Sequence, residues 1–266
     1  MATFAQRVTD FYDYMLEKGD PRVEDWFLMK NPLPIIAIEI FYLVGVVWLG
    51  PRIMANRQPF NLKGLMIVYN GFLVLLSMYM FYEFRISSWL ANYSYRCQPV
   101  DYSNDPLALR MANVCWWYFF SKVIELLDTI IFVLRKKNNQ ISFLHVFHHS
   151  TMIINWWLGV KYIAGGQSWF LAMCNSFIHI LMYSYYALAA IGPQMQKFLW
   201  WKRYMTQMQL IQFVLVVCHT GYNIYIDCNF PQGFNYAVFA YGIFLIILFS
   251  NFYIRSYFAK KEKQKE

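Results

Sequence analysis

Three histidines with helical spacing lie inside an apolar run of the chain. His145, His148 and His149 fall within residues 143–163. Positions i, i+3 and i+4 share one face of a helix, so we expect the three rings to point the same way. Neutral imidazole is a base and a nucleophile near neutral pH, and it is also a common zinc ligand. From the residues alone, acid–base, nucleophilic and metal chemistry all stay open.

Polar side chains with helical spacing also occur in the neighbouring apolar runs. An ionisable group at membrane depth costs roughly 2.5–3.5 kcal/mol, so we expect such groups to be paired or used. Spacings of three and four residues put each set on one helix face. The alternatives are an ion-pair network that only orders the helices, and simple hydrogen bonding between helices. The sets are Lys122, Glu125 and Asp128; Asn175, His179 and Tyr183; and Thr206, Gln209 and Gln212.

The composition predicts an all-α integral membrane protein. Of 266 residues, 59% are hydrophobic and 14% charged, whereas soluble domains carry about 25% charged residues. We expect one domain, residues 1–266, with a lead-in at 1–33 that lacks a secretory signal and a basic tail at 255–266. Most of the apolar runs are near the roughly 20 residues that cross a bilayer. The seven predicted crossings are 35–49, which carries Glu39, then 65–84, 111–134, 143–163, 169–190, 204–226 and 236–254.

The distribution of Lys and Arg predicts the orientation of these crossings. Seven crossings place 14 of the 23 basic residues on the side of the C-terminus, which we therefore expect to be cytosolic, with the N-terminus lumenal or extracellular. The net charge of +8 is explained by this bias, and no nucleic-acid partner is expected. Cys97 and Cys228 then fall in lumenal loops, where a disulfide or two free thiols are the alternatives. Asn92 begins a glycosylation sequon in the first of these loops.

Four motifs, read in order along the chain, are similar to those of one enzyme family. They are Lys122-Val-Ile-Glu125-Leu-Leu-Asp128-Thr129, His145-Val-Phe-His148-His149, Asn175-Ser-Phe-Ile-His179-Ile-Leu-Met182-Tyr183-Ser-Tyr185-Tyr186 and Thr206-Gln-Met-Gln209-Leu-Ile-Gln212. Together they resemble the very-long-chain fatty acid elongase (ELO) family. The flanking sequences QISFLHVFHH and AGGQSWF, with Val146 after the first histidine of the His145–His149 box, resemble the branch of the family that handles very long and polyunsaturated chains.

The resemblance implies a fold and a reaction. Family members form an inverted barrel of six transmembrane helices around a closed acyl tunnel, with the first helix outside. They are 3-oxoacyl-CoA synthases, which condense malonyl-CoA with a long acyl-CoA in the first step of elongation. The resemblance implies the endoplasmic reticulum membrane as the location. It implies no cofactor beyond the two CoA substrates, and it suggests other elongation-cycle enzymes, membrane lipid and a second copy of the chain as partners.

On this basis a mechanism can be written for the polar residues. We expect His148 to attack the acyl thioester, giving an acyl-imidazole. We expect His149 or His179 to assist decarboxylation, with Asn175 and Gln209 as hydrogen-bond donors. His145 completes the histidine box, and no metal is assigned. Residues expected to orient this machinery are Lys122, Glu125, Asp128 and Tyr183, and those expected to bind CoA phosphates are Lys136, Lys137, Lys202, Arg203 and Arg255.

Two other functions fit part of the pattern. A histidine-box, metal-dependent membrane oxidoreductase or hydrolase is the first, although the chain has five histidines and one box. A seven-helix receptor or transporter is the second, and the clustered histidines at mid-membrane depth argue against it. A cysteine nucleophile is disfavoured because Cys115, Cys174 and Cys218 are not well placed relative to the polar faces.

Overall fold

The computed structural model describes residues 3–258, and these are helical with connecting turns and no strand. The all-α prediction is confirmed over that range. The contacts divide the chain into two compact units. Unit 1 contains the described residues of Met1–Pro59 together with Val100–Ser168, and unit 2 contains Phe60–Pro99 with the described residues of Trp169–Glu266. A single domain stays a prediction. Most of the basic tail, from residue 259 onward, lies outside the described residues.

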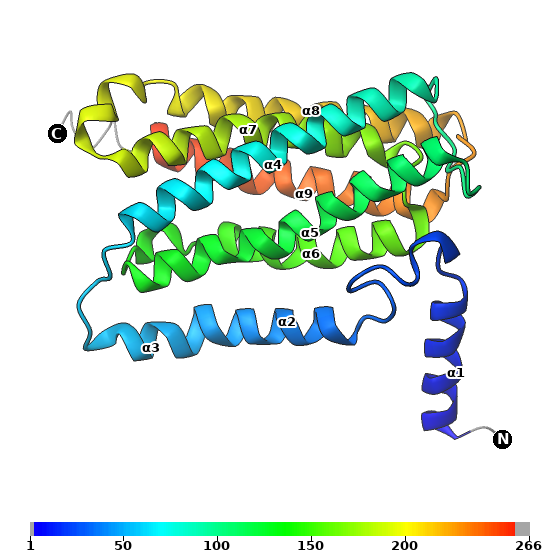
Figure 1. Cartoon of the computed structure of the whole chain (residues 1–266), viewed down its shortest axis with the longest axis horizontal. Helices are drawn as coiled ribbons and strands as arrows, with labels where there is room; N and C mark the ends of the chain where they lie inside the picture. Colours follow the sequence, from blue (N-terminus) through cyan, green and yellow to red (C-terminus); the bar gives the residue numbers. More distant parts are fainter. Residues whose placement is uncertain (1–2, 259–266) are drawn as a thin grey trace. The chain divides into compact units, whose positions relative to one another are not determined.

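Unit 1 contains a long helical rod, residues Leu33–Ala55, and a pair of helices. In Figure 1 the rod is continuous through α2 and α3, and α5 lies beside α6. Helix α6 coincides with the predicted run 143–163, and it begins where the Ser142 side chain accepts the His145 N–H. Such an N-cap satisfies a backbone donor that the helix itself leaves unpaired. The elements are α1 (Phe4–Glu17), α2 (Leu33–Leu43), a π-helical turn η2 (Val44–Leu49), α3 (Gly50–Ala55), α5 (Pro106–Leu134), η3 (Asn138–Gln140) and α6 (Phe143–Ile163).

The rod continues past the predicted end at residue 49 because a π turn accommodates the Gly50-Pro51 pair. Proline lacks an N–H and its ring clashes with an α-helical carbonyl one turn back. Here the Gly50 N–H bonds the Gly45 carbonyl, the wider spacing of a π turn. A Cβ on Gly50 would lie 2.5 Å from the Gly45 carbonyl oxygen and 2.7 Å from Val133 Cγ1 of α5. Glycine therefore lets the rod approach α5 closely.

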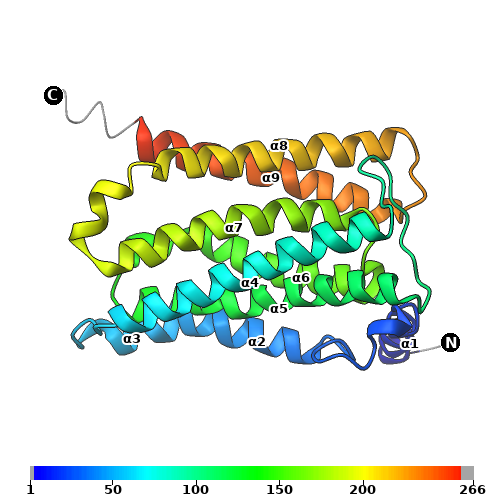
Figure 2. The same ribbon diagram turned by 45° about the horizontal axis from the view of Figure 1, so that its top comes forward.

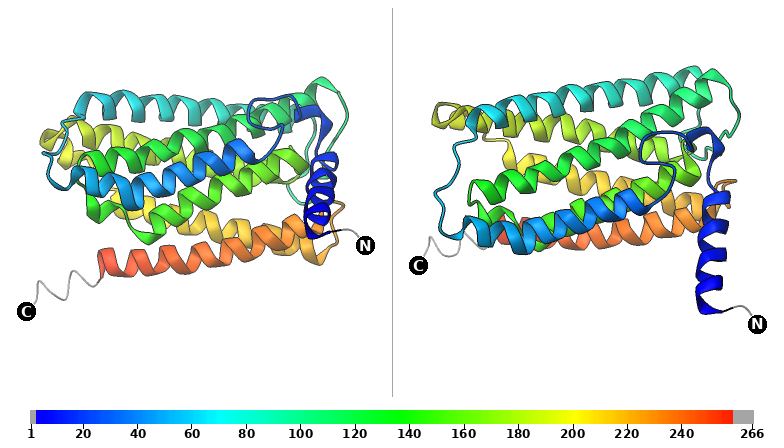
Figure 3. Two further views of the ribbon diagram at one scale, coloured as in Figure 1. Left: turned by 90° about the horizontal axis from the view of Figure 1, so that it is seen from below. Right: turned by 60° about the horizontal axis from the view of Figure 1, so that its bottom comes forward.

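The lead-in folds onto the ends of α5 and α6, with α1 extending away from the rod (Figure 3). Helix α1 buries no residue. After it, Arg22 Nη2 bonds the Asp20 carboxylate at 2.6 Å and the Ala164 carbonyl at 3.0 Å. Burial opposes ionised Arg22, but the bonds and charge of Asp20 raise the pKa of the guanidinium. The Trp116 indole N–H donates to the Phe27 carbonyl at 3.0 Å. These contacts order a segment that the sequence left irregular.

Unit 2 contains four long helices. Figure 2 shows α8 beside α9, the most extensive helix pair of the unit. After α4 the chain turns at Asn92, which is exposed and has a φ of 51°. Asparagine tolerates this left-handed conformation better than most residues. Its glycosylation stays a prediction. The elements are α4 (Lys63–Leu90), α7 (Ser168–Ile191), η4 (Pro193–Phe198), α8 (Lys202–Tyr225) and α9 (Gln232–Tyr257).

A disulfide joins the loop after α4 to the turn after α8. It links Cys97 to Cys228, whose Cα atoms are 5.6 Å apart. The loop is also held by His219, whose Nε2 lies 3.0 Å from the Tyr95 carbonyl oxygen. This contact gives His219 a structural role within unit 2. The remaining cysteines, Cys115, Cys174 and Cys218, are free.

Replacing Cys228 with serine is expected to lower the free energy of unfolding by about 2–4 kcal/mol, the usual range for loss of a native disulfide. Thermal unfolding in detergent, with and without reductant, measures this. Cys218→Ser is the matched control, because Cys218 is an exposed free thiol, and it should change little. Maleimide labelling of the denatured, unreduced protein should find three thiols, and labelling of all five cysteines would contradict the bond.

Several helices have the length of membrane spans. Within residues 3–258, three are both long and apolar enough to cross a membrane: Leu33–Ala55, Lys63–Leu90 and Gln232–Tyr257. Helices α5 to α8 contain 29, 21, 24 and 24 residues. At 1.5 Å per residue the shortest spans about 31 Å, enough for a bilayer core of about 30 Å. These four helices carry the polar motifs, which lowers their hydropathy. Seven crossings, the barrel and the orientation stay predictions.

Candidate functional site

The three box histidines lie side by side on α6. The ring centroids of His145 and His149 are 4.3 Å apart, and those of His148 and His149 are 5.8 Å apart. All three residues are half-buried. One stretch of α6 therefore places the His149 ring in contact with the rings of both His145 and His148.

A buried ion pair on α5 lies near the histidines. Lys122 Nζ is 2.7 Å from Glu125 Oε1, and the two side chains are 2% and 4% exposed. The ammonium also stands 4.4 Å from the ring centroid of Tyr118. Lys122 and Glu125 both interact electrostatically with His149, and Asp128 interacts with Lys122. Within unit 1, Lys122 and Glu125 of the first motif therefore lie in electrostatic range of the histidine box.

A hydrogen-bonded chain also reaches the box from the first rod. The Tyr42 hydroxyl of α2 lies 2.8 Å from Thr129 Oγ1 of α5. Thr129 Oγ1 in turn lies 2.9 Å from His145 Nε2. Sequence reasoning placed Thr129 in a motif without a role and missed Tyr42. The spacing of the buried residues Ile35, Glu39, Tyr42 and Val46 at steps of four, three and four is the signal that marks this face of the rod.

Unit 2 carries the other two motifs on α7 and α8. Asn175 Nδ2 donates to Gln212 Oε1 at 3.4 Å, and both side chains are buried. The rings of His179 and Tyr183, one turn apart on α7, have centroids 5.5 Å apart. Gln209 Nε2 lies 3.7 Å from the sulfur of Met182. The contacts of Asn175 with Gln212 and of Gln209 with Met182 therefore join α7 to α8. The meeting of these polar groups with the histidine box stays a prediction.

Comparison with known proteins places the chain in a family. Residues 27–265 match the ELO family, described as the GNS1/SUR4 family. The chain is 51% identical over 265 residues to human very long chain fatty acid elongase 4, covering 100% of this chain and 83% of the relative. It is 52% identical over 253 residues to rat very long chain fatty acid elongase 7, covering 94% of this chain and 90% of the relative. The protein belongs to the ELO family. The family resemblance read from the four motifs is confirmed.

The basic residues of this ELO protein fall into two groups. In unit 1, Lys136 Nζ donates to the Ala55 carbonyl at 3.0 Å, and Lys137 beside it is exposed. In unit 2, Arg203 Nε donates to the Tyr253 hydroxyl at 2.8 Å across the α8–α9 pair. Lys202 and Arg255 are exposed at the same end of that pair. Three of the five cations, Lys137, Lys202 and Arg255, are therefore accessible to an anionic ligand.

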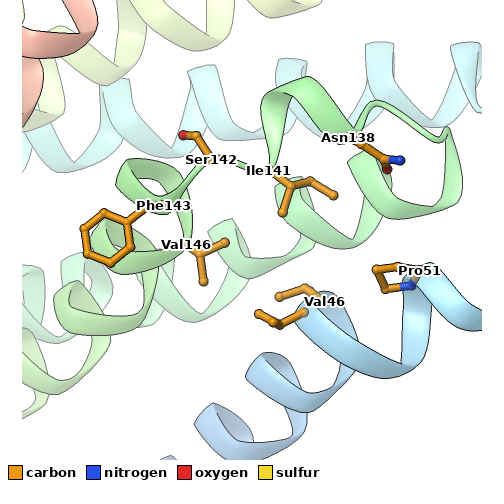
Figure 4. A pocket seen from close by; sticks show the side chains of 8 residues that line it. Val46, Pro51, Asn138, Ile141, Ser142, Phe143 and Val146 are labelled. Carbon is orange, nitrogen blue, oxygen red and sulfur yellow. The ribbon is translucent and has the colours of Figure 1, made fainter.

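One pocket of about 410 Å³ opens between the rod and the first turn of α6 in the ELO protein. Figure 4 shows Val146 and Ile141 directed toward Val46, with Pro51 at the side. The lining includes the Asn138 amide and the Ser142 hydroxyl and no ionisable group. The pocket therefore offers no acid–base chemistry and lies beside the histidine box as a separate feature.

The described residues also bear on the metal-dependent alternative. Between residues 3 and 258, no group of three or more His, Cys, Asp or Glu side chains is arranged to hold a metal ion. The box histidines follow one another along a single helix, so their rings contact each other at 4.3 and 5.8 Å between centroids. The metal-dependent function stays an alternative, which metal analysis of the purified protein tests.

Proposed function

We propose that this protein condenses malonyl-CoA with a long-chain acyl-CoA to give a 3-oxoacyl-CoA, carbon dioxide and free CoA. Membership of the ELO family supports the reaction class. The relatives are named very long chain fatty acid elongases. The observation that carries the proposal is the contact of the His149 ring with the rings of His145 and His148 on α6. The buried Lys122–Glu125 pair lies in electrostatic range of His149.

In the first half of the reaction, His148 acts as the nucleophile. Its ring nitrogen forms a bond to the thioester carbonyl carbon, the carbon–sulfur bond breaks, and the thiolate leaves as CoA after taking up a proton. His149, whose ring lies 5.8 Å from that of His148, is the group suited to move that proton. The Lys122–Glu125 pair holds fixed charges beside His149 and orients it.

In the second half, malonyl-CoA loses carbon dioxide and leaves an enolate. The enolate carbon forms a bond to the acyl carbon, the acyl–nitrogen bond of the imidazole breaks, and His148 is regenerated. We assign stabilisation of the enolate oxygen to Asn175, Gln209 and His179, with Tyr183 beside His179. Preorganised donors of this kind typically contribute a factor of about 10²–10³ in rate.

We also propose how the protein binds CoA and where it is located. Lys136, Lys137, Lys202, Arg203 and Arg255 would contact the CoA phosphates, for which a basic side chain is the natural partner. The proposed location is the endoplasmic reticulum membrane, with several crossings and the C-terminus in the cytosol. Other enzymes of the elongation cycle are the proposed partners, because a 3-oxoacyl-CoA needs a reductase to consume it.

The reaction is tested with purified protein in detergent, malonyl-CoA labelled at its second carbon, and a panel of saturated and polyunsaturated acyl-CoAs. Mass spectrometry should find 3-oxoacyl-CoA two carbons longer than the acceptor, with one carbon dioxide released per product. Absence of carbon dioxide release with every acceptor would refute the proposal. A product formed without malonyl-CoA, together with a stoichiometric transition metal, would support the metal-dependent alternative instead.

A further inference from the structure

Tyr42 and Thr129 form a buried connection between the first rod and the histidine box. Tyr42 is 4% exposed and Thr129 is 0% exposed. Their hydroxyl oxygens are 2.8 Å apart, and Thr129 Oγ1 is 2.9 Å from His145 Nε2. The ring of His145 then contacts that of His149 at 4.3 Å between centroids. A chain of contacts therefore runs from α2 through α5 into the box on α6.

The direction of the hydrogen bonds follows from the donors available. A buried phenol needs an acceptor for its proton, and the acceptor beside Tyr42 is Thr129 Oγ1. With that bond accepted, the Thr129 hydroxyl proton is free to point at His145 Nε2. A ring nitrogen that accepts a hydrogen bond carries no proton, so the proton of neutral His145 sits on Nδ1. The two hydroxyls thus fix one tautomer of His145.

The packing of the rod against α5 places the Tyr42 hydroxyl beside Thr129. The buried residues of the rod form a single stripe, and Tyr42 lies on it one turn before Val46. Gly50, one further turn along, approaches α5 so closely that a Cβ would lie 2.7 Å from Val133 Cγ1. This close approach at Gly50 and the Tyr42–Thr129 bond hold the rod against α5 at two levels.

We propose that Tyr42 is a positioning residue for the histidine box. It acts through Thr129, whose hydroxyl it orients toward His145 Nε2, and it thereby keeps His145 in one tautomer and one ring orientation against His149. Without the phenol, the Thr129 hydroxyl is able to turn back to a carbonyl of its own helix, a common arrangement for threonine. We call the hydrogen-bonded chain of Tyr42, Thr129 and His145 the relay. The inference rests on the proposed function, because that function gives the relay a reaction to support.

Steady-state kinetics of four variants test the relay. Tyr42→Phe keeps the ring and removes the hydroxyl, and kcat should fall about tenfold with little change in KM. Thr129→Val should lower kcat about 10–100-fold, as expected when a group that orients an active histidine is lost. Thr129→Ser, which keeps the hydroxyl, should stay within about threefold of wild type. The Tyr42→Phe, Thr129→Val double variant should match Thr129→Val, because Tyr42 acts through Thr129. Tyr82→Phe removes an exposed hydroxyl and is the control.

A spectroscopic measurement tests the tautomer without reference to turnover. In ¹⁵N-histidine-labelled protein, the His145 signals are assigned by their loss in His145→Gln. Wild type should show the proton on Nδ1, and Thr129→Val should show a mixture of tautomers. A proton on Nε2 in wild type would overturn the inference, as would full activity of Tyr42→Phe or additive losses in the double variant. If wild-type protein forms no 3-oxoacyl-CoA, the proposed function fails, whereas the tautomer measurement still decides the hydrogen-bonded chain.

Discussion

His148→Ala is expected to abolish condensation, with turnover falling by at least about 10³-fold, the scale seen when a covalent nucleophile is removed. The reason is that the acyl-imidazole is the proposed intermediate, and water or a neighbouring ring does not replace it. Incubation of wild type with acyl-CoA alone should add the mass of one acyl group to the intact protein. The His148→Ala variant should show no such addition.

The control is a histidine outside the box. His219 bonds the Tyr95 carbonyl oxygen within unit 2, so His219→Gln should keep the acyl adduct and most of the turnover. An adduct at wild-type level on the His148→Ala protein would exclude His148 as the nucleophile. Peptide mapping of that adduct would then identify the residue that carries it.

Lys122→Met is expected to lower the free energy of unfolding by about 3–5 kcal/mol, because it leaves a buried carboxylate without its partner. Lys122 Nζ and Glu125 Oε1 are 2.7 Å apart, and both side chains are almost fully enclosed. Unfolding in detergent, followed by temperature or denaturant, measures the loss. The Lys122→Met, Glu125→Leu double variant should recover part of it, because it removes both charges together.

The matched control for that change is Lys30→Met. Lys30 is exposed, and surface substitutions usually alter stability by less than about 0.5 kcal/mol. If Lys122→Met unfolds like Lys30→Met, the pair does not contribute to stability. A double variant less stable than either single one would show that packing around the two side chains matters more than their charges.

Helix positions and helix faces were the predictable part of the structure. Residues 143–163 were predicted as a helix from their apolar run of membrane-spanning length, and α6 has those bounds. The contact between His145 and His149 follows from their spacing alone. The pairing of Lys122 with Glu125 is likewise local, since three residues separate them. In each case one helix determines the geometry.

Apart from the Cys97–Cys228 disulfide, which was one of two alternatives, contacts between distant segments were not predicted from the sequence. Tyr42 and Thr129 are 87 residues apart, and the first crossing was predicted over residues 35–49 with no partner assigned to Tyr42. The π turn that carries the helix through Gly50-Pro51 depends on close packing against Val133 of α5. The folding of Asp20 and Arg22 onto the α6 end also depends on tertiary contacts, which no local pattern reveals.

The rod Leu33–Ala55 is held in place by one narrow stripe of buried residues. Its other apolar residues, such as Ile36, Ile40 and Val47, are exposed. The lipid or detergent that surrounds the protein therefore covers most of this helix. It also competes with the packing contacts of the buried stripe. The hydrocarbon thickness of a bilayer or the tail length of a detergent becomes an experimental variable. The rates of wild type and variants are therefore comparable only when all are measured in the same medium, either micelles or nanodiscs.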